Sequence, residues 1–152
     1  MEKLNITKID KNFKYNDGGR KDAGFKGTTG DCAVRAISIA TKKPYKEVYD
    51  EINLLSKDEK IGKRKKRKSN ARTGVYTRTM RKYLKNLGWE WKPTMFIGSG
   101  CQFHLCKEEL PEGILIVRLS RHFTTMINGI INDTYNPSRE GTRCVYGYWC
   151  KN

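Results

Sequence analysis

The chain has 152 residues, of which 37% are apolar, which is enough for a single domain with its own core. No apolar run reaches the roughly 18 residues of a membrane span, and the first residues show no secretory leader, so we expect neither a membrane protein nor a secreted one. The 31 lysines and arginines outnumber the 16 acidic residues, and the net charge of +15 will attract polyanions.

The five cysteines are an odd number, so they cannot all pair within one chain. Without a secretory segment, this count favours free thiols in a reducing compartment. We therefore expect a cytoplasmic protein with no membrane partner.

The first part of the chain predicts an irregular arm followed by two helices. Residues 1–27 are polar and glycine-rich, which is typical of a loop laid over a domain. A buried helix is predicted to begin at Cys32, because Ala33, Ala36, Ile37 and Ala40 fall on one stripe. Pro44 fits the first turn of a second amphipathic helix.

A strongly basic segment, residues 57–74, then interrupts the helices. It has almost nothing to bury, so we expect an exposed, mobile loop. Three roles are open: a solvated loop, a contact for nucleic acid or another acidic partner, or a clamp for an acidic substrate. Its candidate polyanion-binding residues are Lys63, Arg64, Lys65, Lys66, Arg67, Lys68 and Arg72. A third helix with apolar residues from Tyr76 to Leu87 follows and is predicted to stop at Gly88.

After Gly88 the apolar pattern changes to a period of two, which predicts strands. The expected strands are 89–95, 114–119, 122–126, 131–135 and 142–149. Asn128-Gly129, between the third and fourth of these, is typical of a tight hairpin. Helices first and strands later predict an α+β domain with a mainly antiparallel C-terminal sheet.

Cys32 is a candidate nucleophile because a glycine-containing loop delivers it to the first turn of a helix. The partial positive charge and unpaired N–H groups of a helix N-terminus stabilise a thiolate and can also stabilise an oxyanion. The alternative is that Cys32 is only a small apolar residue at a helix start.

His122 and Asp133 are the candidate base and orienting group. A two-residue Asn128-Gly129 loop pairs Ile127 with Ile130, so His122 and Asp133 point to the same side as diagonal neighbours, roughly 7–8 Å apart. A carboxylate in that position can orient an imidazole. The alternative is a solvent-facing histidine with Asp133 as a strand-end residue, but Cys32 completes a catalytic set.

Two segments resemble papain-like cysteine peptidases. Gly30-Asp31-Cys32-x-x-Arg35-Ala-Ile-Ser resembles the cysteine box of OTU-type deubiquitinases. The strand His122-Phe123, the hairpin and Asp133 followed by Asn136-Pro137 resemble the histidine box of double-glycine and papain-like peptidases. The chain also resembles a group of short bacterial and phage proteins that brings no function with it.

The resemblance implies a papain-like fold over residues 1–152, with a central helix beginning at Cys32. It also implies a hydrolase that cleaves a peptide, isopeptide or amide bond of a protein or peptide through a thioester, without a cofactor. Cys32 would be the nucleophile, His122 the base and then acid, and Asp133 the orienting group. Transfer of the acyl group to an amine is chemically adjacent.

The chain departs from these families at the second oxyanion donor. Thr29 stands where OTU enzymes usually carry an aspartate, and no glutamine precedes Cys32, although papain-like peptidases usually have one there. Candidate donors are the backbone N–H groups of Thr29, Gly30 and Asp31, or the side chain of Asn16.

A second cluster of chemically active residues contains Cys101, His104 and Cys106, with Cys144 and Cys150 later in the chain. Thiolates and imidazoles bind zinc, but this spacing matches no standard finger or ribbon, so we assign no metal. The rival to a hydrolase is a small basic protein that binds nucleic acid or inhibits a partner, on a catalytically inactive papain-like scaffold.

Overall fold

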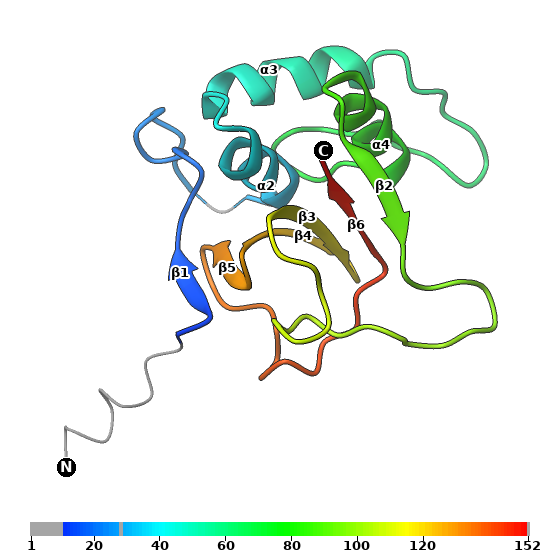
Figure 1. Cartoon of the computed structure of the whole chain (residues 1–152). Coiled ribbons are helices and arrows are strands. Elements are labelled where there is room, and N and C mark those ends of the chain that lie inside the picture. The colour runs from blue at the N-terminus through cyan, green and yellow to red at the C-terminus, as the bar shows by residue number, and fades with distance from the viewer. Residues whose placement is uncertain (1–10, 28, 152) are drawn as a thin grey trace.

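The computed structural model describes residues 11–27 and 29–151, and it has the predicted α+β architecture (Figure 1). Its described part contains three helices: α2 (Cys32–Thr41), α3 (Tyr45–Ser56) and α4 (Thr77–Asn86). Helix α2 packs across β3, β4 and β5 of the sheet, α3 packs on α2, and α4 connects α3 to β2. The helix that carries Cys32 is therefore the one closest to the middle of the sheet.

The sheet has six strands in the described residues, in the order β1-β5-β4-β3-β6-β2. Their bounds are β1 (Phe13–Tyr15), β2 (Glu90–Pro93), β3 (Ile114–Leu119), β4 (His122–Ile127), β5 (Ile130–Asp133) and β6 (Gly147–Cys150). Only β1 and β5 pair in parallel, so the sheet is mainly antiparallel, as predicted.

Two tight hairpins set the position of β4. Ile127 pairs with Ile130 across Asn128-Gly129, as predicted, and both turn residues have a positive φ, which Asn and Gly adopt most readily. At the other end of β4, Leu119 pairs with His122 across a two-residue connection. His122 is therefore the first residue of β4 and lies at one end of the central strands.

The alternation of side chains along the sheet divides the core into two layers. Ile116 of β3 packs with the helices, whereas its neighbours Leu115 and Val117 pack on the opposite face. The helical layer includes the fully buried Ile37 and Ile52. Both faces of the central strands are therefore covered by buried apolar side chains, which stabilise their position beneath α2.

The N-terminal arm is not irregular throughout, contrary to the prediction. Phe13–Tyr15 form β1, and the amide of Ile131 donates to the carbonyl of Asn12 at 2.7 Å. This strand depends on pairing with β5, more than 100 residues later, as its register with Asp133 shows. A three-residue strand stabilised by so distant a partner leaves no local pattern. Residues 1–10 of the predicted arm lie outside the described residues.

The last predicted strand, 142–149, was too long at its beginning. The structure has only Gly147–Cys150 as β6, and the preceding segment turns through positive φ at Arg139, Glu140 and Gly141. Within 142–146, Cys144 instead pairs with His104 in an isolated bridge, and the amide of Val145 donates to the carbonyl of Phe103.

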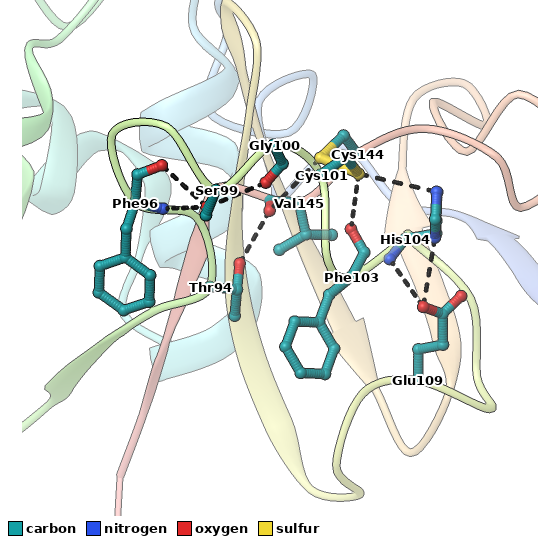
Figure 2. Close-up of a disulfide and its surroundings, with 10 residues drawn as sticks. All are labelled: Thr94, Phe96, Ser99, Gly100, Cys101, Phe103, His104, Glu109, Cys144 and Val145. Carbon is teal, nitrogen blue, oxygen red and sulfur yellow. Dashed lines mark hydrogen bonds and ion pairs between the residues drawn. A yellow bond between two sulfur atoms is a disulfide. The ribbon is translucent and has the colours of Figure 1, made fainter.

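The expectation of free thiols was wrong for two cysteines. Cys101 and Cys144 form a disulfide, and Cys32, Cys106 and Cys150 are free (Figure 2). The bridge forms because residues 103–105 run antiparallel to 143–145, with His104 paired to Cys144. Separately, no helix among the described residues is long and apolar enough to cross a membrane.

Candidate active site

Cys32 is the first residue of α2, where the sequence predicted it. The preceding loop is pressed against residues 72–74: the amide of Gly30 donates to the carbonyl of Arg72 at 2.7 Å, and a Cβ at Gly30 would lie 2.9 Å from the carbonyl oxygen of Thr73. Glycine is therefore required at position 30 by this close approach. The loop leaves Cys32 half-buried at a cavity of about 380 Å³.

His122 lies in the same cavity and makes the predicted pair with Asp133. Its Nε2 atom is 2.7 Å from Oδ2 of Asp133, and both side chains are buried. Cys32 lines the same cavity and interacts with this imidazole, and the interaction helps to raise the pKa of His122. Asp133 therefore occupies one ring nitrogen, and the cysteine lies within reach of the ring at the cavity. The three predicted catalytic residues come together.

A hydrogen bond between α2 and β4 holds Cys32 and His122 in position relative to each other. The hydroxyl of Thr125 in β4 donates to the backbone carbonyl of Ala36 in α2 at 2.7 Å, and both atoms are buried. One turn of α2 separates Ala36 from Cys32, and three residues of β4 separate Thr125 from His122. The bond therefore limits any sliding of the nucleophile's helix along the strand that carries the imidazole.

The electrostatics of His122 and Asp133 favour the charged pair. Burial alone would lower the pKa of His122, but the hydrogen bonds to Asp133 and Cys32 outweigh it and raise the pKa to about 9. Burial opposes ionisation of Asp133, but the hydrogen bond and charge of His122 outweigh it and lower the pKa of Asp133. At neutral pH the imidazole is therefore protonated and ready to donate a proton.

Arg35 is a residue of the candidate site that the sequence reasoning did not identify as such. Its Nη1 atom donates to Oδ1 of Asp133 at 3.0 Å, and its Nε donates to Oδ1 of Asp31 at 3.1 Å. Both carboxylates and the guanidinium are buried. The i, i+4 spacing from Asp31 to Arg35 was visible in the sequence, but the link to Asp133 was not.

Asp31 belongs to this network through its side chain. The hydroxyl of Tyr45 donates to its Oδ2 at 2.5 Å and that of Thr29 to its Oδ1 at 2.7 Å. Burial would raise the pKa of Asp31, but these hydrogen bonds and Arg35 together lower it. The carboxylate just before the nucleophile is thus turned inward as an anchor for α2 and its loop.

The candidate oxyanion donors fall in different places. Thr29 and Gly30 line the cavity, but the Gly30 amide already donates to Arg72. The Asn16 side chain does not line the cavity and instead donates to Oδ1 of Asn132 at 3.3 Å. The backbone N–H groups of Thr29 and Asp31, next to the first turn of α2, stay as predictions for this role.

The predicted polyanion-binding residues lie in an exposed segment without helix or strand, anchored at a few points. Lys65 pairs with Glu59 at 3.1 Å, Lys68 donates to a backbone carbonyl, and Arg72 donates to that of Lys26. The remaining four are exposed: Lys63, Arg64, Lys66 and Arg67. Thr73 and Gly74, the last residues of the basic segment, line the Cys32 cavity together with Val75, so the segment ends at the site.

The second cluster of sequence candidates lies apart from the cavity of Cys32. His104 Nε2 is 3.6 Å from Sγ of the disulfide-bonded Cys101, and its Nδ1 is 3.2 Å from Glu109 (Figure 2). In the part of the chain that the structure describes, no group of three or more His, Cys, Asp or Glu side chains is arranged to hold a metal ion.

Comparisons of the chain with protein-family models, with curated proteins and with solved structures found no match.

Proposed function

We propose that the protein is a cysteine hydrolase that cleaves a peptide, isopeptide or amide bond. One observation carries the proposal: His122 is held by Asp133 at 2.7 Å and lines the same cavity as Cys32, with which its imidazole interacts. A nucleophile, a base and an orienting group brought together in this way are the minimal set for acyl transfer through a covalent intermediate.

In the reactive form, the one proton that Cys32 and His122 share lies on the imidazole. In the first step, the thiolate sulfur of Cys32 then forms a bond to the substrate carbonyl carbon. The helix N-terminus stabilises the charge on the resulting oxyanion. Collapse of this intermediate breaks the bond to the leaving amine, which takes the proton from His122. The products are a free amine and a Cys32 thioester.

In the second step, His122 accepts a proton from water, which attacks the thioester carbonyl. The carbon–sulfur bond breaks, the carboxylic acid leaves, and the proton returns to the Cys32–His122 pair. Asp133 stays ionised throughout and holds the imidazole in one orientation, which its lowered pKa allows. Replacement of water by an amine would make the same site a transferase.

The proposal is tested by the rate at which iodoacetamide modifies each free cysteine, followed by mass spectrometry of the peptides. Cys32 should react at least tenfold faster than Cys106, whose thiol pKa is raised to about 11 by burial and Glu109. The His122→Ala variant should remove the advantage. Equal rates at all three free thiols, unchanged by His122→Ala, would refute the nucleophile.

Nucleic-acid binding is a second candidate function, favoured by the cationic face of α4. Arg78, Arg81, Lys82 and Lys85 recur at helical spacing, and none forms an ion pair with the acidic residues that the structure describes. We expect any such binding to weaken steeply with salt. Binding that is lost when Arg78, Arg81, Lys82 and Lys85 are neutralised, together with an unreactive Cys32, would favour this function over hydrolysis.

A further inference from the structure

The cavity beside Cys32 is lined by three arginines and, within the described residues, by no acidic side chain. The lining residues that matter here are Cys32, Arg35, Arg118, Arg121, His122 and Phe123. Arg35 is neutralised by Asp31 and Asp133, as described above. The other two arginines differ from it in their partners.

Arg118 lies in β3 directly opposite Phe123, the residue after His122. Its guanidinium carbon is 5.7 Å from the ring centroid of Phe123 and 5.7 Å from that of Tyr146, and the side chain is half-buried. It makes no ion pair with any carboxylate in the described residues. Two aromatic rings thus hold a partly desolvated cation that lacks a counter-ion beside the catalytic imidazole.

Arg121 is the second unpaired cation at this cavity. It precedes His122 directly, at the turn between β3 and β4, with a positive φ of 57°. A non-glycine residue in this conformation carries a small conformational cost, which the register between Leu119 and His122 imposes. Its exposed side chain forms no ion pair in the part of the chain described.

We propose that Arg118 and Arg121 form an anion subsite that selects substrates with a carboxylate next to the carbonyl that Cys32 attacks. This inference rests on the proposed function, because it names the substrate class of the same site. A substrate carboxylate would supply the counter-ion that Arg118 lacks, in a partly dehydrated position where a charge-assisted hydrogen bond is strong. An acidic peptide side chain or a free C-terminal carboxylate provides this group.

The test uses two alkylating reagents that share the same leaving group and differ in charge. Iodoacetamide is neutral and reports the intrinsic reactivity of a thiol, whereas iodoacetate carries the carboxylate that the subsite should attract. In each case the thiolate displaces iodide and forms a carbon–sulfur bond. The ratio of the iodoacetate rate to the iodoacetamide rate at Cys32 therefore isolates the charge of the cavity.

The same protein supplies internal references. We expect the ratio at Cys32 to be about fivefold or more above that at Cys150, and to fall as added salt screens the arginines. At Cys106 the ratio should be low, because the carboxylate of Glu109 lies 3.1 Å from its sulfur and repels iodoacetate. The three free thiols of one chain thus differ in the charges that surround them.

Variants of the two arginines then test which side chain raises the ratio of the iodoacetate rate to the iodoacetamide rate at Cys32. Arg118→Gln and Arg121→Gln should each lower the ratio at Cys32 severalfold while iodoacetamide alkylation stays fast. Arg118→Lys keeps the charge and should retain part of the ratio. Lys85→Gln removes an equal charge from the exposed face of α4, outside this cavity, and should change nothing. Because Arg121 is exposed, its variant separates the subsite from any folding defect at Arg118.

The two proposals fail differently. In one outcome, iodoacetamide modifies Cys32 rapidly and His122→Ala slows the reaction, but the ratio of the iodoacetate rate to the iodoacetamide rate equals that at Cys150 and is unchanged by both arginine variants. This outcome overturns the anion subsite and leaves the hydrolase proposal intact. If Cys32 reacts no faster with iodoacetamide than the other thiols do, the hydrolase proposal is overturned, and the anion subsite that depends on it is overturned too.

Discussion

Arg35 and Asp133 are joined by a buried hydrogen bond of 3.0 Å between Nη1 and Oδ1, while the other oxygen of Asp133 faces His122. Both oxygens of this carboxylate are therefore held by cationic partners from different elements. Because Arg35 lies one turn after Cys32 on α2, the helix that carries the proposed nucleophile also holds Asp133, which in turn holds the imidazole of His122.

Replacement of Arg35 by methionine should lower the free energy of unfolding by about 3–5 kcal/mol. The change leaves two buried carboxylates without their shared cation, and breaking a buried pair costs this much when one partner is removed. Urea unfolding measured by circular dichroism gives the value. The iodoacetamide rate at Cys32 should fall as well, since Asp133 is freed to rotate.

Arg35→Lys is the matched control for charge. A lysine restores one positive charge but cannot contact Asp31 and Asp133 at once, so about half of the lost stability should return. A loss below about 1 kcal/mol for Arg35→Met would contradict the structural role of the network.

The Asp133→Asn variant should slow iodoacetamide alkylation of Cys32 by about 10- to 100-fold at neutral pH, because the negative charge that keeps His122 protonated is gone. The pKa of His122 should fall towards its ordinary value, which NMR titration of the imidazole measures directly. Asn132→Asp offers a neighbouring control in β5 that adds a charge without replacing the residue that contacts the imidazole. An unchanged His122 titration in Asp133→Asn would show that the pair does not set the imidazole's charge.

The positions of Cys32, His122 and Asp133 were predictable because each depends on short-range sequence signals. Asn128-Gly129 fixes the hairpin, the hairpin fixes the register of β4 with β5, and the period of two then puts His122 and Asp133 on one side. The position of Cys32 at the start of a helix followed from the glycine-containing loop before an apolar helical pattern. The expectation that the helix and the hairpin meet came from the catalytic set that their residues would complete, and the resemblance to known enzymes supported it.

The features that were missed depend on contacts between distant segments. β1 forms because β5 offers a free edge, and the disulfide forms because residues 103–105 lie beside 143–145. Arg35 was visible as part of a motif, but its bond to Asp133 spans 98 residues. Local periodicity carries no information about such pairs, so they could not be deduced from one sequence.

Reduction of the Cys101–Cys144 disulfide should lower the free energy of unfolding by about 4 kcal/mol in the chain-entropy model, because the bond closes a loop of 43 residues. Urea unfolding with and without a dithiol reductant measures the difference. The double variant Cys101→Ser/Cys144→Ser should show no effect of the reductant. If it responds as strongly as the unaltered protein, the disulfide does not stabilise the fold.

The stability of the folded protein should fall as the pH rises through the pKa of His122. That pKa is raised from 6.5 to about 9 on folding, so the folded state binds the proton more tightly than the unfolded chain. The resulting stabilisation, up to about 3 kcal/mol, is fully present below pH 6.5 and is lost between there and about pH 9. Urea unfolding across this range measures the slope, and His122→Gln, which does not titrate, should flatten it. Cys32→Ala should keep much of the slope, since the bond to Asp133 remains. If the slope is the same with and without the imidazole, His122 is not the group that titrates, and its pairing with Asp133 does not stabilise the fold.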